Sequence, residues 1–293
     1  MGTTVFKRKI YNEILEWKNN RSDKYALLIR GARRVGKSTI VEEFASKEFK
    51  SYIMLDFART SKDINSLFED LYSLDFFFLQ LQQLTGVRLY EQESVIIFDE
   101  VQLLPKARQA IKYLVEDGRY KYIETGSLLS IRKNTKDILI PSEEHKIDMY
   151  PMDFEEFLWA IGDEVTADTI RILLENKRSA GNTMHRSLMR VFRLYMLVGG
   201  MPQAVEKYLA DNNLQVVDET KREIIDLYVE DFTKIDGTGL AGDVYDAIPA
   251  SLSGNASRYV LANARAGIKS GQMRELVPDM LSSYTVLIAY HAN

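Results

Sequence analysis

A glycine-rich segment near the start of the chain has the residue types needed to hold a phosphate chain. In RGARRVGKST, Gly31 and Gly36 have the spacing G-x-x-x-x-G-K-[ST] of a phosphate-binding loop. Glycines allow backbone conformations that side chains hinder, so that N–H groups can converge on an anion. The apolar run from Tyr25 to Ile29 predicts a strand before the loop, and the spacing from Ser38 to Phe49 predicts a helix after it.

The side chains of this loop predict how a nucleoside triphosphate would be held. Lys37 would contact the β- and γ-phosphates, and the Ser38 hydroxyl would coordinate Mg²⁺. A chance Gly-Lys-Ser string in a surface turn is the alternative, and the two flanking patterns argue against it. The sequence therefore predicts ATP and Mg²⁺ as cofactors, with the nucleotide held by Gly31, Ala32, Arg33, Arg34, Val35, Gly36, Lys37, Ser38 and Thr39.

A second motif places two carboxylates at the end of an apolar run, in SVIIFDE. At the carboxyl end of a parallel strand, Asp99 would hold Mg²⁺ and Glu100 would orient and polarise the attacking water. A solvated turn is the alternative. An acid suited to water attack favours hydrolysis over phosphoryl transfer to a small molecule.

A third apolar segment, KYIETGS, ends in hydroxyl-bearing residues. If its strand lies between the strands of the two motifs, Thr125 or Ser127 could sense the γ-phosphate. An ordinary strand-ending turn explains these residues equally well. The transition state also calls for an arginine, and the sequence leaves the choice open among Arg33, Arg34, Arg132 and Arg258.

Composition excludes several classes of site. The chain has 293 residues, 3 histidines, no cysteine and a net charge of −4, so disulfides, thiolate metal sites and cysteine nucleophiles are ruled out. The net charge gives no global attraction to nucleic acid. No apolar run is long enough to cross a bilayer, so we expect no membrane association and a cytoplasmic location.

The elements that must position these residues follow two different sequence patterns, one on each side of residue 150. Up to residue 150, apolar runs alternate with helical patterns at 5–18, 38–49, 63–84 and 105–117, which predicts an α/β three-layer sandwich with a parallel sheet. In the helix over 63–84, we expect Phe77, Leu81 and Leu84 to face the core. The predicted strands are 25–29, 52–55, 95–98, 122–124 and 146–149.

Beyond residue 150 the pattern becomes helical throughout. The expected domains are therefore 1–150 for the phosphate-binding part, 151–236 for a helical domain and 237–293 for a small helical region. Arg186, Arg190 and Arg193 fall on one face of a predicted helix, where a solvated stripe is favoured over a DNA contact. The chain ends directly after an apolar run, so we expect the last region to be truncated.

Five segments together resemble a prokaryotic, archaeal-ATPase-like family of AAA-type P-loop ATPases. The resemblance implies that Gly36, Lys37 and Ser38 bind nucleotide, that Asp99 and Glu100 form the Walker-B pair, and that Ser127 or Thr125 is the sensor. It also implies that 237–293 is a small helical, possible winged-helix unit, and the family's following nuclease-like region has no counterpart. The segments are, in order, RGARRVGKST, IIFDEVQ, ETGSLLS, YPMDFEEF and GGMPQAV.

Mg²⁺-dependent ATP hydrolysis that drives a conformational switch is the function these features favour. An ATP-binding regulator or scaffold with negligible turnover is the main alternative, and a small-molecule kinase ranks below it because no lid with arginines is evident. The N-K-x-D motif of GTPases does not follow the second motif. Besides ATP, the partners left open are DNA, a protein and a second copy of this chain in a homo-oligomer.

Overall fold

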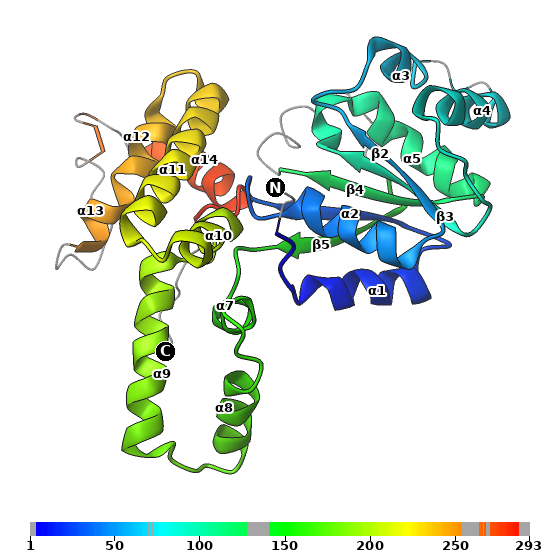
Figure 1. Ribbon diagram of the computed structural model, residues 1–293. Coiled ribbons are helices and arrows are strands. Elements are labelled where there is room, and N and C mark those ends of the chain that lie inside the picture. Colours follow the sequence, from blue (N-terminus) through cyan, green and yellow to red (C-terminus); the bar gives the residue numbers. More distant parts are fainter. Residues whose placement is uncertain are drawn as a thin grey trace.

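A parallel sheet of five strands lies at the centre of the first half of the chain (Figure 1). The computed structural model describes residues 4–69, 71, 73–127, 141–253, 264–265, 267 and 270–286. The strand order is β2-β3-β4-β1-β5, and every neighbouring pair is parallel. All five predicted strands are confirmed, as β1 (Ala26–Gly31), β2 (Ser51–Asp56), β3 (Ser94–Asp99), β4 (Lys121–Gly126) and β5 (Glu144–Met149).

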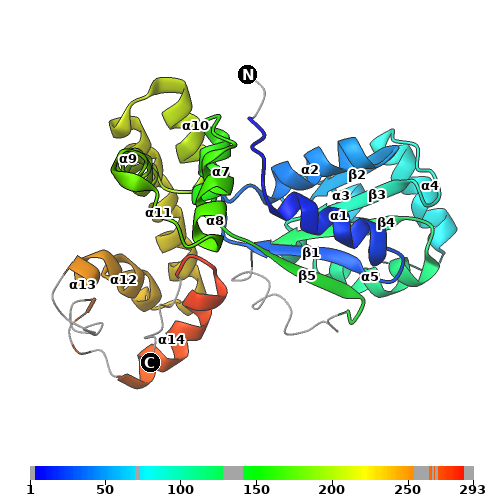
Figure 2. The ribbon, with the colours of Figure 1, turned by 90° about the horizontal axis from the view of Figure 1, so that it is seen from below.

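Helices cover both faces of the sheet, as Figures 1 and 2 show. On one face, α1 (Ile10–Asn20) and α2 (Lys37–Glu48) pack their apolar residues against the sheet, with Ile14 and Phe44 fully buried. On the other face, α4 (Leu74–Thr85) and α5 (Pro105–Asp117) do the same with Leu81 and Leu114. The three-layer α/β architecture that the alternating pattern predicted is therefore confirmed.

The predicted helix over 63–84 is two helices in the structure, α3 (Lys62–Ser66) and α4. Each begins after a serine whose hydroxyl accepts a backbone N–H, Ser61 from Ile64 and Ser73 from Phe76. The prediction that Leu84 is a core residue is wrong, because its side chain is 45% exposed. α4 ends at Thr85, so Leu84 lies in its last turn, and the buried face of the helix consists of Phe77, Phe78 and Leu81.

The first helix begins at Ile10, five residues later than the pattern at 5–18 predicted. The preceding segment is held by tertiary contacts that a helix would not allow. The backbone N–H of Lys9 donates to the carboxylate of Glu156 at 2.7 Å, and the side chain of Arg8 donates to the carbonyl of Val35 at 3.0 Å. Amphipathic spacing alone does not reveal such long-range contacts.

Within the described residues, the elements after β5 are all helices, and no further strand occurs there. The fold is therefore an α/β sheet domain with a helical C-terminal region, as expected, while the exact domain boundaries stay predictions. No helix of the described residues is long and apolar enough to cross a membrane. The helices are α7 (Phe154–Ala160), α8 (Thr166–Glu175), α9 (Gly181–Val198), α10 (Pro202–Asp211), α11 (Leu214–Asp236), α12 (Leu240–Asp246), α13 (Ile248–Ser253) and α14 (Ser270–Ser282).

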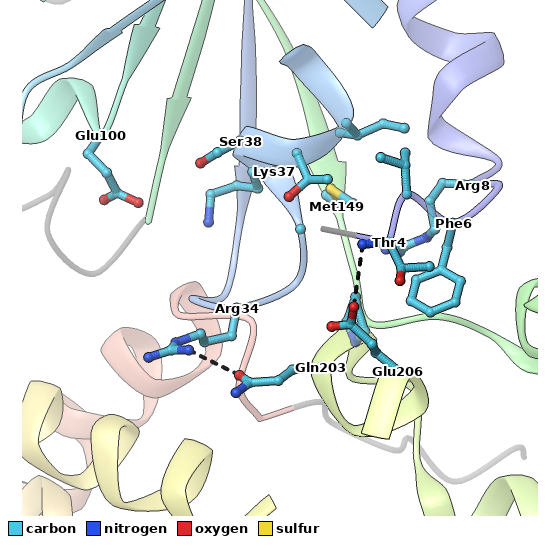
Figure 3. A pocket seen from close by; sticks show the side chains of 15 residues that line it. Thr4, Phe6, Arg8, Arg34, Lys37, Ser38, Glu100, Met149, Gln203 and Glu206 are labelled. Carbon is cyan, nitrogen blue, oxygen red and sulfur yellow. Dashed lines mark hydrogen bonds between the residues drawn. The ribbon is translucent and has the colours of Figure 1, made fainter. Parts of the chain in front are cut away.

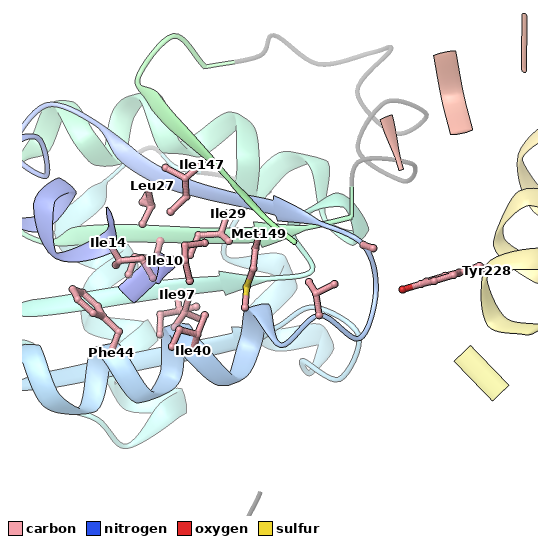
Figure 4. Close-up of a cluster of buried hydrophobic side chains, with 14 of the residues drawn as sticks. Ile10, Ile14, Leu27, Ile29, Ile40, Phe44, Ile97, Ile147, Met149 and Tyr228 are labelled. Carbon is pink, nitrogen blue, oxygen red and sulfur yellow. The ribbon is translucent and has the colours of Figure 1, made fainter. Parts of the chain in front are cut away.

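The long helix α11 packs beside the sheet at the end where β1 gives way to α2. Its residues Ile224, Tyr228 and Phe232 belong to the same buried cluster as Ile29 of β1 and Val35 (Figure 4). The turn before α10 is tightly packed within the helical region, because a Cβ on Gly200 would lie 2.1 Å from the carbonyl oxygen of Met152. The side chains of α11 in the shared cluster join the helical region to the sheet domain by packing as well as by the chain.

Candidate nucleotide-binding site

The loop between β1 and α2 lies at the carboxyl edge of the sheet, where β1 is flanked by β4 and β5. Gly36 has φ +96° and Arg34 has φ +67°, both in the left-handed region. A Cβ at Gly31 would lie 2.2 Å from the carbonyl oxygen of Met149 on β5, so only glycine fits there. Alternation of left-handed and ordinary residues turns successive N–H groups to one side, which makes a concave site for an anion.

The N-terminus of α2 faces this loop. The amide of Ile40 donates to Gly36 at 3.0 Å, and the amides of Lys37, Ser38 and Thr39 precede it at the start of the helix. The first N–H groups of a helix have no acceptor within the helix, and the helix dipole adds partial positive charge there. A phosphate is therefore a favourable ligand at this end of α2.

The ammonium of Lys37 lies inside the loop. Its side chain is 5% exposed, and Nζ donates to the carbonyl oxygens of Gly31 at 3.1 Å and Ala32 at 2.9 Å. Burial lowers the pKa of Lys37, while the nearby carboxylates of Glu100 and Asp99 act in the opposite direction. The loop therefore holds a buried ammonium against two of its own carbonyl oxygens.

Asp99 at the end of β3 meets hydroxyls from both neighbouring motifs. Ser38 Oγ donates to Asp99 Oδ1 at 2.8 Å, and Thr125 Oγ1 donates to the same oxygen. The strand order β3-β4-β1 brings these groups together, because β4 lies between the strands of the two motifs. Ser127 is also buried and lies just beyond the end of β4, one residue past Gly126.

Glu100 is turned by an unusual backbone conformation, with φ +55°. Its N–H donates to Thr125 Oγ1 at 3.2 Å, and its carboxylate accepts a hydrogen bond from the side chain of Gln102. Thr125 thus contacts both acids of the second motif. Gln102 is not among the predicted site residues, although the segment IIFDEVQ contains it.

A pocket of about 440 Å³ extends from these residues toward the N-terminus and α10 (Figure 3). Lys37, Ser38 and Glu100 line one part of it, while Phe6 and Glu206 line another. The sequence did not predict this second wall, formed by Phe6 and Glu206, because no local motif links residues so distant in sequence. Within this wall the N-terminal segment contacts α10, since the N–H of Thr4 donates to Glu206 Oε1 at 3.4 Å.

The side chains near Asp99 suit Mg²⁺. Ser38 Oγ and Asp99 Oδ1 are hard oxygen donors 2.8 Å apart. Within the described ranges, no group of three or more Asp, Glu, His or Cys side chains could hold a metal ion by itself. Mg²⁺ at phosphate sites takes one or two protein ligands and completes its shell with water and phosphate oxygens, so this pair fits it.

Two of the candidate arginines are engaged with the helical region. Arg33 Nη1 contacts both carboxylate oxygens of Asp231 at 2.9 Å, and Arg34 Nη1 donates to the side chain of Gln203 at 3.0 Å. Arg34 also lines the pocket. Arg132 and Arg258 lie outside the described residues.

Comparison with known proteins agrees with the fold. Residues 23–158, the part that holds the glycine loop and both acids, match the family described as an AAA domain. The resemblance stated from the sequence segments is thereby confirmed at the level of the family.

Two relatives extend the comparison. An uncharacterized protein of Methanocaldococcus jannaschii is 24% identical over 203 residues, a match that covers 66% of this chain and 40% of the relative's length. A solved structure of a Walker-type ATPase from Pyrococcus abyssi is similar with a TM-score of 0.55 and 18% identity, over 95% of this chain and 90% of the other. The second likeness supports the shared fold over nearly the whole chain.

Proposed function

We propose that this protein binds ATP with Mg²⁺ and hydrolyses it. The observation that supports the proposal most is the meeting of Lys37, Ser38, Asp99, Glu100 and Thr125 at the ends of three adjacent strands. Residues far apart in the sequence supply a cation, two hydroxyls and two acids at one place. These are the groups that phosphoryl transfer to water requires.

The contacts of Lys37 suggest how a triphosphate would enter the loop. The ammonium would exchange the carbonyls of Gly31 and Ala32 for β- and γ-phosphate oxygens, while the loop amides and the N-terminus of α2 hold the remaining charge. Ser38 and Asp99 would hold Mg²⁺, which when bound neutralises charge on the phosphate oxygens.

Glu100 is the proposed residue that activates water. Its carboxylate lines the pocket together with Lys37 and Ser38, and an ionised carboxylate can accept a proton from a bound water. Gln102 donates to one oxygen of this carboxylate, which leaves the other oxygen able to accept a hydrogen bond from water.

The second wall of the pocket is the proposed place of the nucleoside. Phe6 and Pro202 supply apolar surface, and Glu206 supplies an acceptor that an amino group on a base could use. A volume of about 440 Å³ lies within the usual range of small-molecule sites.

Phosphate release tests the proposal directly. Glu100→Gln is expected to lower the rate of ATP hydrolysis by about a hundredfold, since a general base contributes at least that factor, while ATP binding persists. Glu116→Gln, an exposed position on α5, is the matched control and should hydrolyse ATP like the wild type. Equal rates for wild type and Glu100→Gln would exclude this role of Glu100.

A regulator that binds ATP with negligible turnover is the second candidate. The hydrogen bond from Gln102 to Glu100 favours it, because a hydrogen bond that stabilises the ionised carboxylate makes it a weaker base toward water. Purified protein that retains ATP with its γ-phosphate intact over hours would support this candidate against the first. Release of phosphate in multiple turnovers would exclude it.

The partner that uses the nucleotide cycle is a further proposal. Arg186, Arg190 and Arg193 are exposed on α9, so DNA is one candidate, and a protein or a second copy of this chain are the others. Phosphate release measured with and without duplex DNA, and at rising protein concentration, separates them. Stimulation by DNA supports the first, and a specific activity that rises with protein concentration supports a homo-oligomer.

A further inference from the structure

Two side chains of α11 contact the phosphate loop from outside it. The hydroxyl of Tyr228 donates to the carbonyl oxygen of Arg33 at 2.7 Å, and Asp231 pairs with the guanidinium of the same residue at 2.9 Å. Positions three apart lie on one face of a helix, so both reach the same part of the loop. Figure 4 shows Tyr228 pointing from α11 toward this end of the sheet.

The hydroxyl of Tyr228 is buried and stays protonated at this position. Its side chain is 7% exposed and packs in the cluster that includes Val35 and Phe232. Burial raises the pKa of Tyr228, so the phenol keeps its proton throughout the physiological pH range. The hydrogen bond to Arg33 is therefore always available to the loop.

The contact fixes the direction of a peptide group. The carbonyl of Arg33 and the N–H of Arg34 belong to one planar trans peptide unit and point to opposite sides. Because Tyr228 holds this carbonyl on the outside, the N–H of Arg34 is turned to the inside of the loop. Arg8 fixes the peptide between Val35 and Gly36 in the same way. Its Nη1 donates to the carbonyl of Val35 at 3.0 Å, so the N–H of Gly36 is turned inward.

The backbone between these two hydrogen-bonded carbonyls is strained. Arg34 has φ +67°, a conformation that is unfavourable for a residue other than glycine and persists only when the surroundings impose it. Tyr228 fixes the peptide before Arg34, and Arg8 fixes the peptide that begins at Val35. The ion pair with Asp231 anchors the side chain of Arg33 on α11, away from the inside of the loop.

We propose that Tyr228, supported by Asp231, is a positioning residue that holds the phosphate loop in its anion-binding form. The inference rests on the proposed binding of nucleotide, and it makes α11 of the helical region a part of the phosphate site. Since the β-phosphate is common to ATP and ADP, the loss of this hold weakens binding of both nucleotides by the same factor.

Tyr228→Phe removes the hydroxyl and keeps the ring. With Mg²⁺ and the full chain, we expect dissociation constants for ATP and ADP that rise together by about three- to tenfold, the range of one neutral hydrogen bond. Tyr245→Phe is the matched control, because its ring lies 6.3 Å from that of Tyr228 in the same cluster. It should bind both nucleotides like the wild type.

Hydrogen exchange supplies a second measurement that does not need nucleotide. The peptide over residues 31–38 should exchange its amides faster in Tyr228→Phe and in Asp231→Asn than in the wild type. Asp218→Asn, which removes an ion pair with Arg222 on the same helix, should leave that exchange unchanged. A general loss of stability would instead raise exchange throughout the sheet.

The possible outcomes separate the two proposals. A wild type that binds no nucleotide would refute the proposed function and this inference together. A wild type that binds ATP, with Tyr228→Phe that binds equally well and protects the loop amides equally well, would refute the positioning role alone. A loss confined to ATP, with ADP unaffected, would also refute it.

Discussion

Thr125 is the residue that joins the two acids of the candidate site. Its hydroxyl donates to Asp99 and accepts the N–H of Glu100, and the side chain is fully buried. The sequence left Thr125 and Ser127 as equal candidates for a sensor, since both end the same apolar segment. The strand order brings Thr125 into contact with the second motif, so we assign the sensor role to it as a proposal.

Replacing Thr125 tests that assignment. Thr125→Val keeps the shape and removes the hydroxyl, so the N–H of Glu100 loses its acceptor and the acid its fixed position. We expect ATP hydrolysis to fall by about tenfold, the equivalent of one buried hydrogen bond, while the dissociation constant of ATP changes little. Single-turnover hydrolysis and nucleotide titration give the two quantities.

Two further variants complete the comparison. Thr125→Ser retains the hydroxyl and should keep most of the activity, and Ser127→Ala should be active as well. The assignment fails if Ser127→Ala loses hydrolysis and Thr125→Val does not.

At the scale of elements, the position of β1 between β4 and β5 depends on a glycine. Gly31 ends β1, and a Cβ there would collide with the backbone of Met149 at 2.2 Å. We expect Gly31→Ala to lower the free energy of unfolding by about 3 kcal/mol, the upper part of the range for overpacking, because neither strand can move aside. Urea unfolding measures the difference.

Gly86→Ala is the control for that substitution. Gly86 has φ +69° and nothing within 4 Å of an added Cβ. The substitution should therefore lower the free energy of unfolding by about 1 kcal/mol, the cost of placing alanine in the left-handed conformation. If the two variants unfold at the same urea concentration, the close approach of β1 and β5 does not limit stability.

An acid in the middle of β4 gives the sheet a dependence on pH. Glu124 is fully buried without a hydrogen-bond partner for either carboxylate oxygen, and burial, aided by the charge of Glu144, raises its pKa well above the usual range. A raised pKa means that the folded state binds a proton that the unfolded state releases. The contribution of Glu124 to the free energy of unfolding is therefore greatest below the ordinary pKa of a glutamate. It falls as the pH rises toward the raised pKa.

Glu124→Gln should remove that dependence. The amide stays neutral, so we expect its free energy of unfolding to change less between pH 5 and pH 8 than that of the wild type. The buried pair of Arg108 and Glu144 remains in both proteins, at 2.7 Å and 2.9 Å. Urea titrations at the two pH values measure the slopes, and equal slopes would show that Glu124 is ionised in the folded protein.

How far the sequence predicts these elements depends on the range of the interactions involved. Apolar runs and the glycine loop are local, so all five strands and the loop with its helix could be located in advance. The start of α1 and the exposure of Leu84 could not be predicted, because they depend on a contact with Glu156 and on what packs beside the end of α4. The roles of Phe6, Glu206 and Tyr228 depend on packing between distant segments, which leaves no periodic signal.

At the scale of the whole molecule, the helical region and the phosphate loop share hydrogen bonds. Tyr228 and Asp231 contact Arg33, and Gln203 contacts Arg34. A triphosphate that changes the loop would therefore act on α10 and α11, as the proposed conformational switch requires.

The chain has no cysteine, so that motion can be measured with introduced labels. Tyr113→Cys on α5 and Glu223→Cys on α11 place dyes at exposed positions of the two parts. We expect the distance distribution from single-molecule energy transfer to shift when ATP and Mg²⁺ are added. The same pair with Lys37→Ala, which loses the ammonium of the loop, should show no shift, and an unchanged distribution in the parent pair would argue against a switch.

The contact between Thr4 and Glu206 spans 202 positions of the chain. A polypeptide still being synthesised on the ribosome therefore exposes its glycine loop long before the opposite wall of the pocket exists. The proposed nucleoside subsite would therefore be complete only after α10 has left the exit tunnel and docked beside the N-terminal segment.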